Sequence, residues 1–144
     1  MASARTPRPL DAALGRVGDR WSLLLVEALL DGPRRFNELA DDIHGIAPNI
    51  LTDRLRRLER VAVVRATPYS ERPLRHQYEL TADGRELAGV LRLLASWGAR
   101  DASDAEPLRH ATCGTPMEAQ WYCPTCARTV QDEQGEGSSG LRFV

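Results

Sequence analysis

Apolar residues recur at helical spacing in the first third of the chain. Between Leu10 and Leu30 they fall every three or four positions, which predicts one helix with a weak point at Gly15 and Gly18. The helix is predicted to end at residues 32–33, a glycine and a proline, because proline lacks the backbone donor that would continue the helical ladder.

Two shorter apolar stripes follow, separated by a tight turn at residues 44–46. The first predicts a helix from Phe36 to Ile43. The second begins at Pro48, where the first helical turn tolerates a proline, and extends to about Arg60. Two helices of this length joined by a glycine turn form a helix-turn-helix, in which the second helix is the candidate reader of DNA.

The period of the pattern then changes from helical to alternating. Residues 61–67 and 75–80 are predicted strands, and the polar, proline-bounded segment 68–74 is a predicted loop between them. Thr81 is the predicted N-cap of a last helix over about 82–99. Two helices followed by a hairpin with a basic tip predict a winged helix-turn-helix, a mainly α fold of the α+β class with a small β-hairpin.

The remaining segments lie outside this fold. Residues 1–9 form a proline-bearing N-terminal arm, and residues 10–100 hold the predicted DNA-binding and dimerisation domain. After an acidic linker, residues 108–130 form a candidate metal module, and residues 131–144, rich in glycine, serine and acids, are predicted to be disordered. Without an apolar signal core or a membrane-length apolar run, the sequence favours a cytoplasmic protein.

The net charge hides a local excess of positive charge. The 144-residue chain has a formal net charge of −1, which alone argues against a nucleic-acid partner. Residues 1–100 hold 16 arginines against 13 acids, whereas residues 101–144 hold three against seven. Within residues 50–75, seven arginines face three acids, a surplus suited to the phosphates of DNA.

The predicted reading helix, residues 47–60, has its candidate DNA contacts opposite its apolar stripe. The stripe consists of Ile50, Leu51, Leu55 and Leu58. Asparagine pairs with adenine and arginine with guanine, so the predicted base-reading residues are Asn49, Thr52 and Arg56. Asp53 is predicted either to accept from cytosine or to orient Arg56 or Arg57, and Arg54 and Arg57 are predicted to contact phosphates. A solvated basic helix face is the alternative interpretation.

The predicted wing supplies a second group of contacts, namely Tyr69, Ser70, Arg72 and Arg75. Arginine at a hairpin tip suits a narrow minor groove or the phosphates beside it. Arg34 and Arg35 open the predicted helix at 36–43, whose N-terminal amides attract a phosphate. Surface solubility explains this arginine pair equally well.

All three cysteines lie in one segment beside a histidine. His110 and Cys113 form one pair, Cys123 and Cys126 form a second, and nine residues separate the pairs. Each pair can hold Zn²⁺ from one tight turn, and the intervening loop can fold the two turns together. The four residues are therefore predicted to ligate zinc in a ribbon-like module.

Two uses of that site remain open. As a structural staple, a closed four-ligand site would fold a segment that is too short to bury a core. As a sensor, its thiolates could be oxidised and release zinc. Unrelated thiols and a redox Cys-x-x-Cys are further alternatives, but redox motifs of that kind normally lie in a βαβ context, which the pattern lacks.

Four segments, in this order and spacing, resemble the HxlR-type winged-helix transcriptional regulators. They are Val17-Gly-Asp-Arg-Trp-Ser-Leu-Leu-Leu, Gly32-Pro-Arg-Arg-Phe-Asn-Glu-Leu, Ile50-Leu-Thr-Asp-Arg-Leu-Arg-Arg-Leu-Glu and Tyr78-Glu-Leu-Thr-Ala-Asp-Gly, and Trp97 closes the series. The similarity covers about residues 9–98. It implies a homodimer that binds a palindromic operator in double-stranded DNA, with the first and last helices of the domain pairing across the two-fold axis.

Two positions depart from the family's pattern. The family's usual Gly-Lys-Trp is Asp19-Arg20-Trp21 in this chain. Many relatives have a cysteine just before the proline that opens the first helix, and some use it as a redox sensor, but here Arg8 precedes Pro9. That thiol-sensing mechanism is therefore not carried over.

The leading hypothesis is a dimeric, sequence-specific DNA-binding transcriptional regulator and not an enzyme. Neither His44 nor His76 has a catalytic partner at a recognisable spacing. One alternative is a protein-interaction adaptor that uses the winged domain and the zinc module as surfaces. Another is a regulator that senses redox state or zinc.

Overall fold

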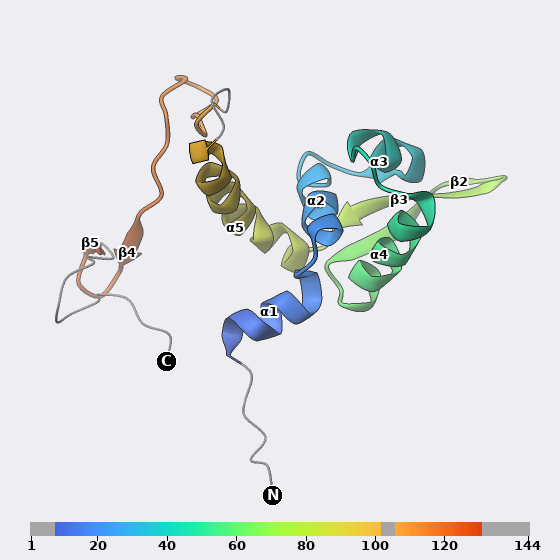
Figure 1. The fold of residues 1–144 in the computed structure, drawn as a ribbon, viewed down its shortest axis with the longest axis horizontal. Coiled ribbons are helices and arrows are strands. Elements are labelled where there is room, and N and C mark those ends of the chain that lie inside the picture. Colours follow the sequence, from blue (N-terminus) through green and yellow to red (C-terminus); the bar gives the residue numbers. More distant parts are fainter. Residues whose placement is uncertain (1–7, 102–105, 131–144) are drawn as a thin grey trace, which may run out of the picture. The chain divides into compact units, whose positions relative to one another are not determined.

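The computed structural model describes residues 8–101 and 106–130 of the chain, which divides into two units, Met1–Leu94 and Ala95–Val144. The elements in chain order are α1 (Pro9–Val17), α2 (Arg20–Ala28), β1 (Arg34–Arg35), α3 (Phe36–Asp42), α4 (Pro48–Arg60), β2 (Val64–Glu71), β3 (Leu74–Leu80), α5 (Ala82–Gly98), a 3₁₀ turn (Ala99–Asp101), β4 (Trp121–Cys123) and β5 (Arg128–Val130) (Figure 1). Among the described residues, no helix is long and apolar enough to cross a membrane. Most of the predicted N-terminal arm and the whole predicted disordered tail lie outside the described residues.

The predicted first helix is two helices, because the chain breaks between α1 and α2. The side chain of Asp19, the N-cap of α2, accepts a hydrogen bond from the backbone N–H of Ser22 and so starts a new helix. A Cβ added at Gly18 would lie 2.3 Å from the carbonyl oxygen of Leu14, so the end of α1 requires a glycine there. The apolar periodicity continues through the break, and the prediction of one helix over 10–30 was wrong.

The helix-turn-helix has almost the bounds that the sequence predicted. α3 begins at Phe36 as predicted and ends one residue early, and α4 runs from Pro48 to Arg60 as predicted. Gly45, in the turn between them, has a φ of +82°, a left-handed conformation that glycine adopts without steric penalty. α4 packs against α2 and β2, which holds one side of this helix inside the domain.

A three-stranded antiparallel sheet, in the order β1-β3-β2, forms the wing. β2 and β3 pair from Val64 opposite Leu80 to the tip of the hairpin, so the predicted loop at 68–74 is mostly strand. The register shifts between Pro68 and Ser70, which lets the ladder accommodate a residue without a backbone donor. The proline was therefore a poor guide to the end of the strand.

The edge strand β1 was not predicted. Arg34 pairs with Tyr78 and Arg35 with Gln77, so the two arginines belong to the sheet before α3 begins. A strand of two residues is too short to leave a periodic signal in the sequence.

α5 begins where Thr81 was predicted to cap it. The Thr81 hydroxyl accepts a hydrogen bond from the backbone N–H of Gly84 at 3.0 Å. A Cβ added at Gly84 would lie 2.2 Å from the carbonyl oxygen of Val63, so only glycine lets the helix approach the backbone so closely.

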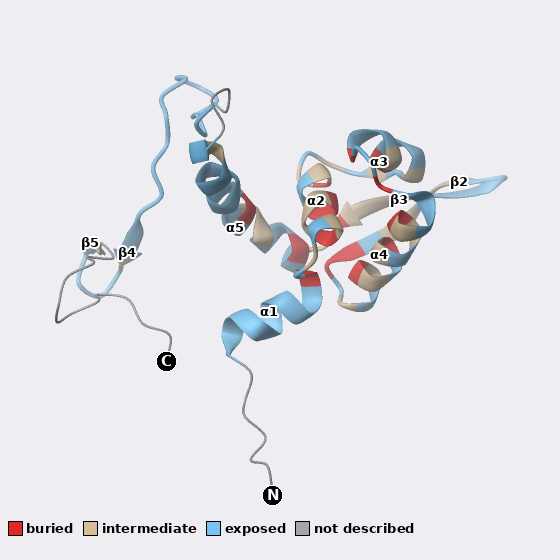
Figure 2. Cartoon of the chain, viewed as in Figure 1, coloured by how far each residue is buried: buried red, intermediate tan, exposed pale blue. Residues whose placement is uncertain are grey.

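The hydrophobic core lies within the winged domain, where the buried residues gather between the helices and the sheet (Figure 2). Its apolar members are Val17, Leu25, Val26, Leu29, Leu39, Ile43, Ile46, Leu51, Leu55, Leu58, Val63, Val64, Leu80 and Leu91. Complete burial of one such side chain stabilises a fold by about 1.5–3 kcal/mol. The core therefore fixes the inner side of α4 firmly.

The described part of the second unit contains a small hairpin. β4 and β5 pair antiparallel, from Trp121 opposite Val130 to Cys123 opposite Arg128. Within residues 106–130, no side chain is fully buried.

Candidate functional site

α4 has one side in the core and another in solvent. Leu51, Leu55 and Leu58 are buried and hold the helix in the domain. Asn49 and Arg56, two of the predicted base-reading residues, are exposed. The helix thus presents polar side chains of the kind that form hydrogen bonds with base edges.

Thr52 and Asp53 have partners within α4. The hydroxyl of Thr52, which is half-buried, donates to the carbonyl oxygen of Pro48 at 2.9 Å. Asp53 is exposed and forms an ion pair with Nη1 of Arg54. Asp53 was predicted to orient Arg56 or Arg57, but the arginine that it contacts in the structure is Arg54.

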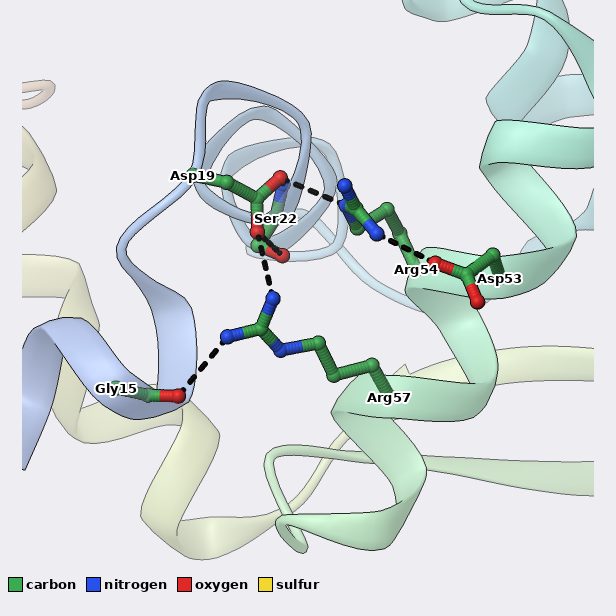
Figure 3. Close-up of polar contacts among 6 residues, drawn as sticks. All are labelled: Gly15, Asp19, Ser22, Asp53, Arg54 and Arg57. Atoms are coloured by element: carbon green, nitrogen blue, oxygen red, sulfur yellow. Dashed lines mark hydrogen bonds and ion pairs between the residues drawn. The ribbon is translucent and has the colours of Figure 1, made fainter.

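Arg54 and Arg57 point toward the junction of α1 and α2 (Figure 3). Nε of Arg54 lies 2.9 Å from Oδ1 of Asp19, and Nη1 of Arg57 lies 3.7 Å from Oδ2 of the same carboxylate. Nη2 of Arg57 also donates to the carbonyl oxygen of Gly15 at 2.9 Å. The two arginines predicted to contact phosphates therefore have intramolecular partners.

The Asp19 carboxylate is the common acceptor at this junction. Oδ1 accepts from the backbone N–H of Ser22 at 3.1 Å, and Oδ2 accepts from the Ser22 hydroxyl at 2.5 Å. Partial burial raises the pKa of Asp19, but the hydrogen bonds from Ser22 and Arg54 outweigh it and leave the pKa below its usual value. The carboxylate is therefore charged at neutral pH.

The wing carries its predicted arginines at the surface. Arg72 and Arg75 are exposed, whereas Tyr69 and Ser70 are half-buried. Cζ of Arg35 lies 4.3 Å from the centre of the Tyr69 ring, a cation–π contact that joins the start of α3 to the wing.

A groove of about 520 Å³ lies between the start of α3 and the wing. Arg35, Tyr69, Arg75 and His76 are among its lining residues. Its two arginines outnumber its one acid, Glu38, and this excess of positive charge suits anionic oxygen atoms such as those of phosphates.

Arg34 and Arg35 are held by the ends of α3. Nε of Arg34 lies 3.8 Å from a carboxylate oxygen of Asp42, in the last turn of the helix. The backbone N–H of Arg35 donates to the carboxylate of Glu38 at 2.6 Å, which caps the first turn. Both arginines precede the helix in β1, so their side chains are positioned by the sheet as well as by α3.

The predicted metal ligands form two separate pairs. Nδ1 of His110 lies 3.2 Å from Sγ of Cys113, and Cys123 and Cys126 lie at the turn of the β4–β5 hairpin. Among residues 8–101 and 106–130, no group of three or more His, Cys, Asp or Glu side chains is placed to hold a metal ion. The structure forms each pair without bringing all four residues together.

Each pair has the donor chemistry of half a zinc site. On a tetrahedral Zn²⁺, an imidazole nitrogen and a thiolate sulfur lie about 3.5 Å apart, close to the spacing of His110 and Cys113. Hydrogen bonds with Thr115 and then His110 lower the pKa of the Cys113 thiol to about 7. The pKa of Cys123 is also lowered, chiefly by hydrogen bonds from Cys126. Both effects favour the thiolate form that binds metals.

Two helices of the winged domain expose rows of apolar side chains. The exposed residues are Leu10 and Leu14 on α1 and Val90, Leu93, Leu94 and Trp97 on α5. Single exposed apolar residues are ordinary, whereas several together are typical of surfaces that contact other proteins.

Sequence reasoning missed Asp19 as a partner of the candidate DNA-reading helix. The residue did give a signal, because an aspartate stands where the resemblance leads one to expect glycine. Its contact with Arg54 joins residues 35 positions apart, and helical periodicity carries no information about such a contact.

Known proteins resemble this chain in sequence and in structure. A profile of the HxlR-like helix-turn-helix family matches residues 16–106. The uncharacterised HTH-type transcriptional regulator Rv3095 of Mycobacterium tuberculosis is 39% identical over 134 residues, which cover 87% of this chain and 84% of the relative.

Solved structures of regulators have the same fold. The crystal structure of PA1607, a protein assigned as a transcription factor, matches with a TM-score of 0.74 and 30% identity over 93% of this chain and 96% of that one. The redox regulator HypR in its oxidised form matches with a TM-score of 0.62 and 31% identity over 65% of this chain and 97% of its own. The chain belongs to the HxlR-like helix-turn-helix family of transcriptional regulators.

Proposed function

We propose that the protein is a dimeric regulator that binds a palindromic operator, with α4 in the major groove of double-stranded DNA. The orientation of α4 carries this proposal, because its leucines are buried while Asn49 and Arg56 are exposed. Asn49 suits an adenine and Arg56 a guanine, each through two hydrogen bonds to the base edge. Thr52 and Asp53 complete the proposed reading surface.

The wing is proposed to contact the minor groove or the phosphates beside it. Arg72 and Arg75 are exposed there, and Tyr69 and Ser70 lie next to them on β2. The groove between the wing and α3 gives a DNA backbone a basic path toward Arg35. Arg34, beside Arg35 in β1, is the remaining proposed phosphate contact of this surface.

The proposed dimer uses the exposed apolar rows of α1 and α5. Burying them against a second copy would remove from water most of the large apolar side chains that the winged domain leaves exposed. A two-fold dimer presents two copies of α4 to two half-sites about one helical turn of DNA apart, which is why the operator is proposed to be palindromic.

DNA binding across a salt series, measured by fluorescence anisotropy on the upstream region of the protein's own gene, tests this proposal. The expected result is a preferred sequence whose affinity falls linearly with the logarithm of salt concentration. Arg56→Ala should cost about 1–3 kcal/mol on that sequence and relax discrimination. Arg72→Ala should weaken binding to all sequences and reduce the salt slope by about 1.

Arg100→Ala is the matched control, because it removes the same charge from the 3₁₀ turn outside both α4 and the wing. It should leave affinity and salt slope unchanged. A wild-type protein without sequence preference would contradict the proposal and favour the adaptor hypothesis.

We also propose that His110, Cys113, Cys123 and Cys126 bind one Zn²⁺ that holds residues 108–130 as a ribbon-like module. The support is the donor chemistry of the two pairs and the spacing of His110 and Cys113. Folding of the segment between the pairs would bring the four ligands together. The bound ion would supply fixed tetrahedral geometry, which stabilises a segment without a core.

A redox-sensing role for the same thiols is the second candidate. HypR, one of the similar structures, is a redox regulator. Since Arg8 precedes the proline that opens α1, thiol sensing in this chain would depend on the C-terminal cysteines. In a sensor, oxidation by a peroxide would both release zinc and change DNA affinity, whereas a staple would show zinc release alone.

A further inference from the structure

Groups from three helices meet in a polar cluster at the junction of α1 and α2. The cluster consists of the Gly15 carbonyl oxygen and the side chains of Asp19, Ser22, Arg54 and Arg57 (Figure 3). The two arginines come from α4, the proposed recognition helix. The cluster is therefore a polar attachment of α4 to the rest of the winged domain, in addition to the apolar one.

The Asp19 carboxylate has more partners than a helix cap needs. Its contacts with Ser22 suffice to start α2. Each oxygen then has a second partner on α4, since Oδ1 accepts from Nε of Arg54 at 2.9 Å and Oδ2 lies 3.7 Å from Nη1 of Arg57. Asp19 thus links the start of one helix to the side of another.

Partial burial makes these ion pairs stronger than ordinary surface pairs. The side chains of Arg54 and Asp19 are 24% and 26% exposed, and that of Arg57 is 32% exposed. A DNA phosphate that took the place of the Asp19 carboxylate would leave a partly buried charge without its partners.

The spacing of the two arginines fixes how α4 is rotated about its own axis. Arg54 and Arg57 lie about one helical turn apart, so both extend from the same side of the helix toward Asp19. Arg56 lies between them in sequence and extends from a different side, where it is exposed. Any rotation of α4 that loosened the Asp19 contacts would also redirect Arg56.

We propose that Asp19 is a positioning residue for sequence readout, which acts through Arg54 and Arg57 to hold α4 at the rotation that directs Arg56 toward base edges. Because it rests on the proposed DNA-binding function, this role deepens that function and assigns it a residue outside the DNA surface. Arg54 and Arg57 then support the reading helix instead of contacting phosphates, contrary to the expectation from sequence.

Asp19→Asn is the decisive variant, because asparagine caps a helix as well as aspartate does but lacks the charge that holds the arginines. If only electrostatics mattered, loss of a negative charge near DNA would strengthen binding. Positioning predicts the opposite, namely a loss of roughly fivefold to tenfold in affinity for the preferred sequence. Affinity for scrambled DNA and the salt slope should not fall, since no phosphate contact is removed.

Arg54→Gln tests the other side of the contact and leaves the helix cap intact. It should reproduce the loss of discrimination without changing the salt slope, in contrast to Arg72→Ala. The double variant Asp19→Asn/Arg54→Gln should lose little more affinity than either single variant, because each of the three variants breaks the same contact. Wild-type discrimination in Asp19→Asn, or a salt slope reduced by about 1 in Arg54→Gln, would overturn the proposal.

Amide hydrogen exchange separates this proposal from the proposed function. Positioning predicts faster amide exchange along α4 in Asp19→Asn than in the wild-type protein. Circular dichroism checks that both proteins are folded. Unchanged exchange along α4 would overturn the positioning role, whatever the protein binds. Wild-type protein without sequence preference would defeat the proposed function, while the exchange result would still decide whether Asp19 holds α4.

Discussion

The winged domain and the C-terminal module differ most in what they bury. Every buried apolar residue in the described part of the chain lies between Val17 and Leu91. Within residues 106–130, by contrast, even Trp121 and Tyr122 are exposed. The domain therefore has the apolar burial that drives folding, whereas the described part of the module has one histidine-cysteine pair and one cysteine pair and no buried apolar core. The zinc staple proposed above would stabilise this short segment by metal ligation instead of apolar burial.

Removal of zinc should produce the largest difference between the two regions. The expected protein contains one zinc per chain by elemental analysis, with all three thiols unreactive until a chelator is added. Structural zinc contributes about 10–16 kcal/mol of apparent binding free energy to domains that have little core. Chelation should therefore make amide exchange fast throughout residues 108–130 and leave the thermal unfolding of the winged domain unchanged.

Cys126→Ser should lose the metal, whereas Thr125→Ser, a comparable change at the neighbouring position of the same turn, should retain it. Metal-free wild-type protein whose module exchanges at the same rate before and after chelation would contradict the proposed zinc staple.

Truncation of one buried and one exposed leucine tests whether apolar burial stabilises the winged domain. Leu55, on the inner side of α4, is 1% exposed, whereas Leu74, at the tip of the wing, is 64% exposed. Leu55→Ala should lower the free energy of unfolding by about 2–5 kcal/mol, because it removes buried methyl groups and leaves a cavity. Leu74→Ala should change it by less than about 0.5 kcal/mol. Chemical denaturation measures both values, and equal losses would show that the core does not carry the stability of the domain.

Local signals in the sequence predicted the helix-turn-helix well. The bounds of α4 followed from Pro48 and the apolar stripe behind it, and both act within a few residues of the helix. The break before α2 was missed because Asp19 acts through a side-chain cap that leaves the apolar pattern intact. The strand β1 was missed because two residues cannot show a period.

In the candidate site too, features that depend on nearby residues were predictable, and contacts with distant elements were not. The exposure of Asn49 and Arg56 could be predicted from a helical wheel, since it depends only on which side of α4 faces the core. The direction of Arg54 and Arg57 could not, because the wheel does not show which element lies beside that side of the helix. The pairing of His110 with Cys113 and of Cys123 with Cys126 is predictable for the same local reason, whereas the described part of the chain does not bring the two pairs together.

The smallest effect is the pH dependence of the Asp19 contact. In the folded protein the pKa of Asp19 is lowered from its ordinary value of 3.8, so the charged carboxylate stabilises the fold above that pH. Asparagine keeps the helix cap but carries no charge, so Asp19→Asn lacks this stabilisation. Wild-type protein should therefore exceed Asp19→Asn in free energy of unfolding by about 1 kcal/mol from about pH 5 to 7.

The difference should shrink as the pH falls below 3.8 and vanish once it has passed the lower pKa of the folded state, because the wild-type carboxyl is then neutral as well. Chemical denaturation at several pH values measures the free energy of unfolding of each protein. The difference between the two values cancels the contributions of the other carboxylates, which both proteins share. Asp31→Asn removes a charge from an exposed aspartate that has no ion pair in the described part of the chain, and it should track the wild type within about 0.5 kcal/mol throughout. A difference that stayed constant through the acid range would mean that Asp19 acts through the shape of its side chain, and its charge would then not be what holds α4.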